Sequence, residues 1–130
     1  MALRKSTILV VDDNQDIRDL VTLILADEGF TTLDAKDANE AMEVLEKSHP
    51  SLVLLDVMMP GKSGIELLRE IRAHRDSRIN QTPVLMMTAK SEIVDIDLAI
   101  SAGASSYIVK PFIAESVIDK VIAFLPEEKD

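Results

Sequence analysis

The 130-residue sequence contains no cysteine and no tryptophan, and aromatic residues make up only 3% of it. Without cysteine the chain can form no disulfide, no thiolate metal site and no cysteine nucleophile. The same absence is compatible with a reducing compartment, and we expect a cytoplasmic protein. Because aromatic residues are scarce, the core must be built mainly from Val, Ile, Leu and Met.

Long apolar runs and excess positive charge are also missing. No segment approaches the roughly 20 apolar residues that a membrane helix needs, and the first apolar run, residues 8–11, is too short for the core of a signal peptide. The net charge is −9, with no basic stripe and no arginine-rich arm. Such a surface should be repelled by phosphate backbones. Neither membrane insertion nor direct DNA binding is therefore expected.

Short apolar segments alternate with amphipathic ones along the whole chain. Strands are predicted at residues 8–11, 31–35, 52–55, 84–87 and 107–109. Four of the five are continuously apolar, which is typical of parallel strands covered on both faces. Helical spacing of apolar residues follows each strand, at 17–25, 41–45, 65–71, 93–100 and 117–125. Fivefold alternation of strand and helix predicts an α/β domain with a parallel sheet and right-handed crossovers.

Local signals support two of these helices. Asp37 and Ser63 are each followed three residues later by Glu, which predicts a capping box at each helix start. Residues 74–82 are expected to form the longest polar connection. Two further groups are expected to have no part in chemistry. These are the methionines, as packing residues, and the histidines, as solvated surface residues: Met58, Met59, Met86, Met87, His49 and His74.

Polar residues stand at the ends of the strongly predicted strands. Asp12 and Asp13 follow the first strand and Asp56 the third, while Thr88 and Lys110 follow the fourth and fifth. Taken singly, most have plainer interpretations, as helix caps, turn residues or a surface lysine. However, open α/β sheets place their sites at the carboxyl ends of strands. The five side chains should therefore meet at one edge of the sheet.

This combination of residues points to phosphoryl chemistry. Three converging carboxylates repel one another unless one is protonated or a cation lies among them. A ligand set made only of oxygen suits Mg²⁺. Lys110 would add a second positive charge and Thr88 a hydroxyl donor, which together suit an incoming phosphoryl group. We therefore predict that Asp56 attacks such a group and forms an aspartyl phosphate.

The order and spacing of these residues resemble the response-regulator receiver domain of two-component signalling, over essentially the whole chain. The matching segments are Ile-Leu-Val-Val-Asp-Asp-Asn at 8–14, Leu-Leu-Asp-Val-Met-Met-Pro-Gly at 54–61, Met-Thr-Ala at 87–89, Gly-Ala at 103–104 and Tyr-Ile-Val-Lys-Pro-Phe at 107–112. The resemblance implies a flavodoxin-like (βα)5 sandwich of three layers, with a parallel five-stranded sheet of order 2-1-3-4-5. We expect one receiver domain over 1–130, similar to stand-alone chemotaxis regulators. Its core would span about 6–125 and its charged tail 126–130, without an output domain.

The resemblance also implies roles for the site residues. Asp56 would accept the phosphoryl group from a phosphohistidine of a sensor histidine kinase or phosphotransfer protein, or from a small donor. Asp13 and Asp56 would bind Mg²⁺ directly, Asp12 mostly through water, and Met58 through its backbone carbonyl; Mn²⁺ could substitute. Lys110 would pair with the phosphate. The protein would then be a signalling phosphoacceptor with self-phosphorylation and self-dephosphorylation chemistry, rather than an enzyme.

A conformational switch is implied as well. Thr88 would move to hydrogen-bond the phosphate, and Tyr107 fits the rotating aromatic of the family, although a half-buried tyrosine on an edge strand is the plainer interpretation. Phosphorylation would then change the surface formed by the helix at 93–100, the strand at 107–109 and the last helix, and so alter binding of a downstream protein. The Lys110–Pro111 bond is a candidate cis peptide.

Three alternatives compete with this interpretation. An Asp-nucleophile phosphohydrolase needs a second acidic residue two positions after the nucleophile, where this chain has Met58. A flavodoxin-like FMN carrier would offer hydroxyl and backbone N–H groups to a phosphate, which Asp12 and Asp13 would instead repel. A receiver excised from a hybrid kinase or from a multidomain regulator would keep the same chemistry, and this alternative stays open.

Overall fold

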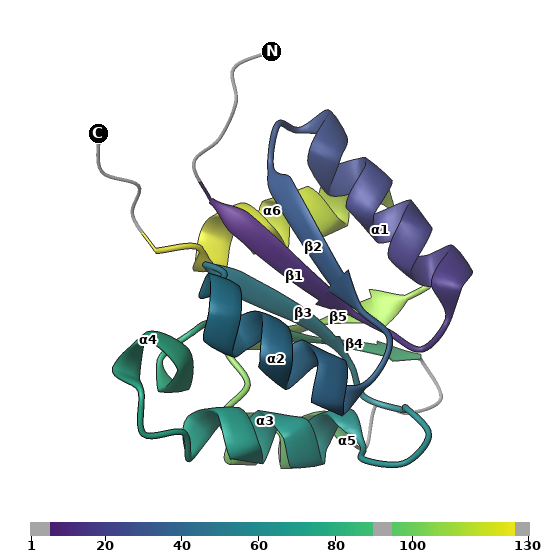
Figure 1. Cartoon of the computed structure of the whole chain (residues 1–130). Coiled ribbons are helices and arrows are strands. Elements are labelled where there is room, and N and C mark those ends of the chain that lie inside the picture. The colour runs from purple at the N-terminus through teal and green to yellow at the C-terminus, as the bar shows by residue number, and fades with distance from the viewer. Residues whose placement is uncertain (1–5, 90–94, 127–130) are drawn as a thin grey trace.

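The computed structural model describes residues 6–89 and 95–126, in which each strand is followed by a helix (Figure 1). The strands are β1 (Thr7–Val11), β2 (Thr31–Ala35), β3 (Leu52–Asp56), β4 (Val84–Ala89) and β5 (Ser106–Lys110). The helices are α1 (Gln15–Asp27), α2 (Ala38–Ser48), α3 (Gly64–Arg72), α4 (Ser77–Asn80), α5 (Asp95–Ala102) and α6 (Ala114–Phe124). Each predicted strand is present, with ends within two residues of those expected.

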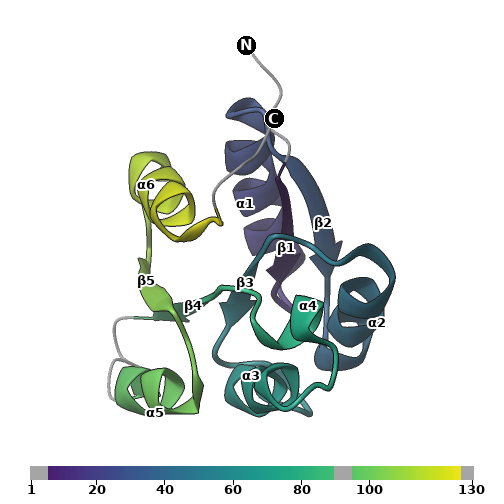
Figure 2. The same cartoon turned by 90° about the vertical axis from the view of Figure 1, so that its left-hand side faces the viewer.

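The five strands form one parallel sheet in the order β2-β1-β3-β4-β5. Figure 2 shows the sheet nearly edge-on, with α1 and α6 over one face and α2, α3 and α5 over the other. The implied fold, a three-layer sandwich of order 2-1-3-4-5, is thus confirmed. Since all strands run the same way, their carboxyl ends lie along one edge.

Alternate residues of the three central strands, β1, β3 and β4, contribute to two separate cores. Leu9 and Val11 of β1 pack in the cluster under α2, α3 and α5, whereas Ile8 and Val10 pack in the cluster under α1 and α6. All five residues of the central strand β3 are buried, including the terminal Asp56. This double covering explains why the strands are continuously apolar in sequence.

Helix starts follow the capping signals in the sequence. The side chains of Asp37 and Ser63 accept hydrogen bonds from the N–H groups of Glu40 and Glu66, as predicted. Asn14 caps α1 in the same manner, accepting from Ile17. These caps satisfy N–H groups that have no partner within the helix. The start of α1, directly after the β1 carboxyl end, is thereby fixed beside Asp12 and Asp13.

The polar stretch 74–82 is not a plain connection, because it contains the one-turn helix α4. Asp76 caps this helix and Ile79 is buried beneath it. Arg72 also holds it: its guanidinium donates to the carbonyls of Asn80 and Thr82 and to that of Gly103 after α5. Burial lowers the pKa of Arg72.

Some side-chain expectations were wrong. Met59, Met86 and Met87 are buried as predicted, but Met58 is 56% exposed and packs in neither core cluster. His74 is not freely solvated, because Nε2 lies 3.1 Å from a carboxylate oxygen of Glu46 and Nδ1 accepts the N–H of Asp76. Residue 93, the first apolar position expected in α5, lies outside the described residues. No helix in the described ranges has both the length and the apolar character to span a membrane.

Candidate functional site

Three carboxylates converge at the carboxyl edge of the sheet. Asp12 and Asp13 follow β1, Asp56 ends β3, and one oxygen from each lies within 4.8 Å of the others. Asp12 is 1% exposed and Asp56 is 5% exposed, whereas Asp13 faces solvent. The sequence predicted this convergence, which follows from the pairing of β1 with β3 at the centre of the sheet. We call these three residues the acidic cluster.

Lys110, at the end of β5, reaches into the acidic cluster. Its ammonium nitrogen Nζ lies 3.0 Å from Oδ2 of Asp12 and 3.2 Å from Oδ1 of Asp56. The other carboxylate oxygen of Asp12 accepts the N–H of Asn14 at 2.9 Å. The lysine therefore offsets one negative charge and holds two carboxylates at fixed positions.

Burial and charge perturb the ionisation of this group. Burial raises the pKa of Asp56 from 3.8 to about 6; Lys110 works against this rise, and the charge of Asp12 adds to it. Burial alone would lower the pKa of Lys110, but hydrogen bonds and charges from Asp12 and Asp56 outweigh it, so that this pKa is raised. The lysine thus stays protonated beside a carboxylate that is costly to ionise.

Two further predicted residues lie on β4 and β5. Thr88 is fully buried, one residue beyond the Met87 that pairs with Asp56, and its hydroxyl donates to the carbonyl of Ala89 at 3.3 Å. Tyr107 is 37% exposed on the edge strand. Within the described residues neither side chain hydrogen-bonds to the acidic cluster.

The segment after Asp56 turns the chain away from the sheet. The Met58 side chain points into solvent, while its backbone N–H bonds to Asp56 and lowers the pKa of that residue slightly. The Lys110–Pro111 bond at the neighbouring strand end is cis, as the resemblance implied. The chain therefore leaves the sheet directly after Asp56 in β3 and directly after Lys110 in β5.

Two residues beside the site were not predicted. Gly64, which starts α3, lies so close to the carbonyl of Asp56 that any side-chain carbon there would collide with it. Arg18 of α1 donates from Nη1 to the backbone carbonyl of Asp12 at 2.7 Å. Both contacts are made to backbone carbonyls and not to side chains, so no residue pattern in the sequence could indicate them.

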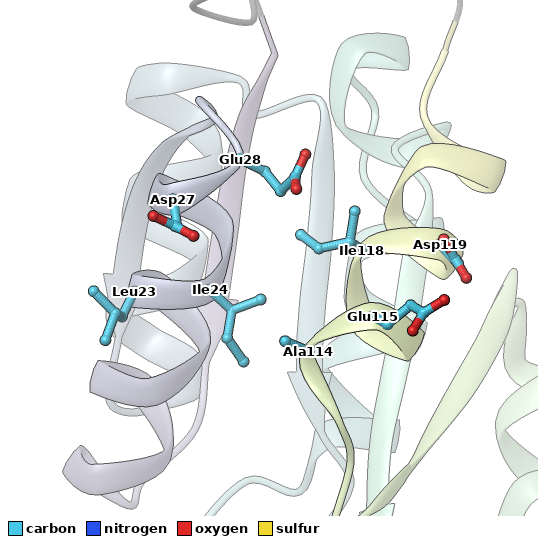
Figure 3. Close-up of a pocket in the computed structure, with 8 residues that line it drawn as sticks. All are labelled: Leu23, Ile24, Asp27, Glu28, Ala114, Glu115, Ile118 and Asp119. Atoms are coloured by element: carbon cyan, nitrogen blue, oxygen red, sulfur yellow. The ribbon is translucent and has the colours of Figure 1, made fainter. Parts of the chain in front are cut away.

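A separate groove lies between α1 and α6. It has a volume of about 590 Å³, and Ile24 and Ile118 point toward one another across it (Figure 3). Carboxylates lie around it, from Asp27 and Glu28 at the end of α1 and from Glu115 and Asp119 of α6. None of its lining residues belongs to the acidic cluster, so the groove is not the site of the chemistry predicted above.

Comparison with known proteins gives a consistent result. The family model of the response regulator receiver domain matches residues 8–122. The DNA-binding response regulator MtrA of Mycolicibacterium smegmatis is 38% identical over 130 residues, and the chain spans 55% of its length. Among solved structures, the receiver domain of NtrX from Brucella abortus has a TM-score of 0.83 and 40% identity, covering 89% of this chain and 95% of that one. Chemotaxis protein CheY4 of Vibrio cholerae has a TM-score of 0.86 and 30% identity, covering 95% and 100%.

Proposed function

The chain belongs to the response regulator receiver domain family, and we propose that Asp56 is its phosphoacceptor. The observation that carries this proposal is the position of the Asp56 carboxylate, buried at the end of the central strand and 3.2 Å from the ammonium of Lys110. A nucleophilic carboxylate must be held rigidly and must face groups that offset the charge of a phosphoryl group. Asp56 meets both conditions.

The acidic cluster fits a divalent cation. Within the described residues, the ammonium of Lys110 hydrogen-bonds to two of its three carboxylates, Asp12 and Asp56, so two negative charges lack a balancing cation when all three carboxylates are ionised. The ligands are oxygen only, which suits Mg²⁺ or Mn²⁺. We assign Asp13 and Asp56 as direct ligands, with Asp12 acting through water and Met58 through its carbonyl. When bound, the metal offsets negative charge on the transferred phosphoryl group.

The remaining residues would act on the phosphoryl group once it arrives. An oxygen of Asp56 forms the new bond to phosphorus as the bond from phosphorus to the donor nitrogen breaks, and the imidazole of the donor keeps the electron pair. Lys110, already hydrogen-bonded to Asp56, would pair with a phosphoryl oxygen. The hydroxyl of Thr88 would supply a further donor, which requires it to leave the carbonyl of Ala89.

The partners follow from this chemistry. The donor would be a sensor histidine kinase or a phosphotransfer protein, and the output would be a downstream protein bound through α5, β5 and α6. MtrA is a DNA-binding regulator, but this chain spans about half the length of the curated relatives it matches. The chain would therefore contribute the phosphoacceptor step, with its own slow self-phosphorylation and self-dephosphorylation.

The test is phosphorylation by acetyl phosphate with Mg²⁺, followed by mass spectrometry of the intact protein. Wild type should gain one phosphoryl group that hydroxylamine removes, as it does from an acyl phosphate, and Asp56→Asn should gain none. Asp27→Asn, on the far end of α1, is the matched control and should be modified like wild type. An unchanged yield in Asp56→Asn, or modification that persists in excess EDTA, would refute the assignment.

A further inference from the structure

We propose that Arg18 is a positioning residue for the acidic cluster, and that it orients the peptide plane between Asp12 and Asp13 for cation binding. This inference rests on the proposed function, since it concerns how the chain holds the residues assigned to the metal. Arg18 itself contacts none of the three carboxylates of the cluster in the structure. Its action is on the backbone that carries two of them.

The first observation is the hydrogen bonding of Asp12. Its N–H donates to the carbonyl of Ala35, its Oδ1 accepts the N–H of Asn14, and its Oδ2 accepts from Lys110. The backbone carbonyl is the remaining polar group, and it accepts from Nη1 of Arg18 at 2.7 Å. This distance is shorter than those of the other three bonds, which range from 2.9 to 3.2 Å.

The second observation is that Arg18 is itself held in place. Its side chain is only 12% exposed, and Nε donates to Oδ2 of Asp34 on β2 at 3.1 Å. Asp34 is 54% exposed and lies beside Val10 in the sheet register. One guanidinium therefore ties α1 to both the edge strand and the loop after β1.

The consequence concerns Asp13. The carbonyl of Asp12 and the N–H of Asp13 belong to one rigid peptide plane. Fixing the carbonyl therefore fixes the direction in which the chain enters Asp13, whose exposed side chain makes no hydrogen bond within the described residues. The guanidinium of Arg18 is also paired with the carboxylate of Asp34, so this ion pair adds little net charge near the acidic cluster.

The charge of Arg18 and its positioning of the loop would change the Mg²⁺ affinity in opposite directions when Arg18 is replaced. If Arg18 acted only through its charge, its removal would strengthen Mg²⁺ binding, because a positive charge would be lost. If it positions the loop, removal should weaken Mg²⁺ binding about tenfold, within the range found when residues that support metal ligands are replaced. The phosphorylation rate at saturating Mg²⁺ should then change less than the affinity, since bound metal would restore the loop geometry.

The measurements are Mg²⁺ titrations followed by amide NMR shifts, and hydrogen exchange of the Asn14 N–H in metal-free protein. Arg18→Ala should raise the Mg²⁺ Kd about tenfold and speed that exchange. Arg18→Lys, which can still donate to one acceptor, should recover part of both. Arg69→Ala, an exposed arginine on α3, is the control and should match wild type.

The outcomes separate the two proposals. If wild type itself binds no Mg²⁺, the proposed function fails. If wild type binds Mg²⁺ and Arg18→Ala binds it equally or more tightly, the positioning role is refuted, even if urea unfolding shows that the variant is less stable. Should Arg18→Ala not fold, Arg18→Lys alone decides, and a Kd and exchange rate equal to wild type would refute the proposal.

Discussion

The ammonium of Lys110 lies 3.2 Å from Oδ1 of Asp56, although 54 residues separate them in the chain. The two residues end β5 and β3, which are separated in the sheet by β4. The Lys110 side chain extends past β4, and its ammonium contacts two carboxylates of the acidic cluster. The contact is therefore a direct consequence of parallel strand order, and it partly offsets the rise in the Asp56 pKa that burial causes.

Replacing Lys110 by Gln should raise the pKa of Asp56 above its value of about 6, because the lysine charge and hydrogen bond both lower it. A carbon-13 NMR titration of the carboxyl groups in metal-free protein would measure this. Phosphorylation by acetyl phosphate should slow by about 100-fold, as when one preorganised donor to developing charge is removed. Lys62→Gln, which removes a surface ion pair with Glu70, is the control, and equal pKa values in both variants would contradict the prediction.

The buried charge of Asp56 should also make stability depend on pH. The folded pKa, about 6, exceeds the ordinary value of 3.8, so between these values the folded state binds more protons and stability falls as pH rises. Asp56→Asn should therefore stabilise the metal-free protein at pH 7, by about 1–2 kcal/mol after allowing for solvent screening of the roughly 3 kcal/mol that two pKa units represent.

Urea unfolding at two pH values would measure this effect. Near pH 3.5 the gain should be small, because Asp56 is then protonated in the folded protein. Asp27→Asn provides the baseline for loss of an exposed carboxylate. A gain that is the same at both pH values would mean that ionisation of Asp56 is not its cause.

Two glycines near the site should differ sharply in their tolerance of Ala. A Cβ at Gly64 would meet the Asp56 carbonyl, whereas one at Gly61 would meet no atom within 4 Å and would only strain a φ of +76°. Gly64→Ala should cost about 3 kcal/mol of unfolding free energy, as overpacking does, and should slow phosphorylation by moving Asp56. Gly61→Ala should cost about 1 kcal/mol. Equal destabilisation in urea would show that β3 can shift without penalty.

The sequence predicted the sheet and the acidic cluster well, for a physical reason. Continuous apolar runs identify strands covered on both faces, and a parallel sheet then brings strand ends together, so Asp12, Asp56 and Lys110 could be placed without coordinates. What it could not indicate was contact through the backbone. Arg18 donates to a main-chain carbonyl and Gly64 lies against one. Every residue has such a carbonyl, so the sequence does not mark which one is contacted.

The errors have similarly local causes. The helix α4 was missed because Ile79 is the only apolar residue in the stretch 74–82, which leaves no helical period to detect. Met58 is predicted to pack like the other methionines, but the chain has already left the sheet at that position and the side chain is 56% exposed. Strand ends are therefore where sequence periodicity stops predicting burial.

The proposed switch gives a prediction that the composition makes unusually direct. Tyr107 is the only tyrosine and the chain has no tryptophan, so intrinsic fluorescence reports on this ring alone. The ring is 37% exposed, and the ammonium of Lys120 lies 5.3 Å from its centre while donating to Ser106. Such a cation–π contact contributes about 0.5–1 kcal/mol at exposed sites. It therefore favours the outward position only weakly.

If Tyr107 turns inward on activation, beryllofluoride with Mg²⁺ should reduce quenching of its fluorescence by acrylamide, because the population shifts toward a buried ring. Thr88→Ala should abolish the reduction, because the hydroxyl that would leave Ala89 for the phosphate is gone. Lys120→Ala should lower quenching before activation, since it removes the outward contact. If quenching in wild type stays constant on activation, Tyr107 is not the moving residue. Any conformational response would then lie elsewhere in the chain.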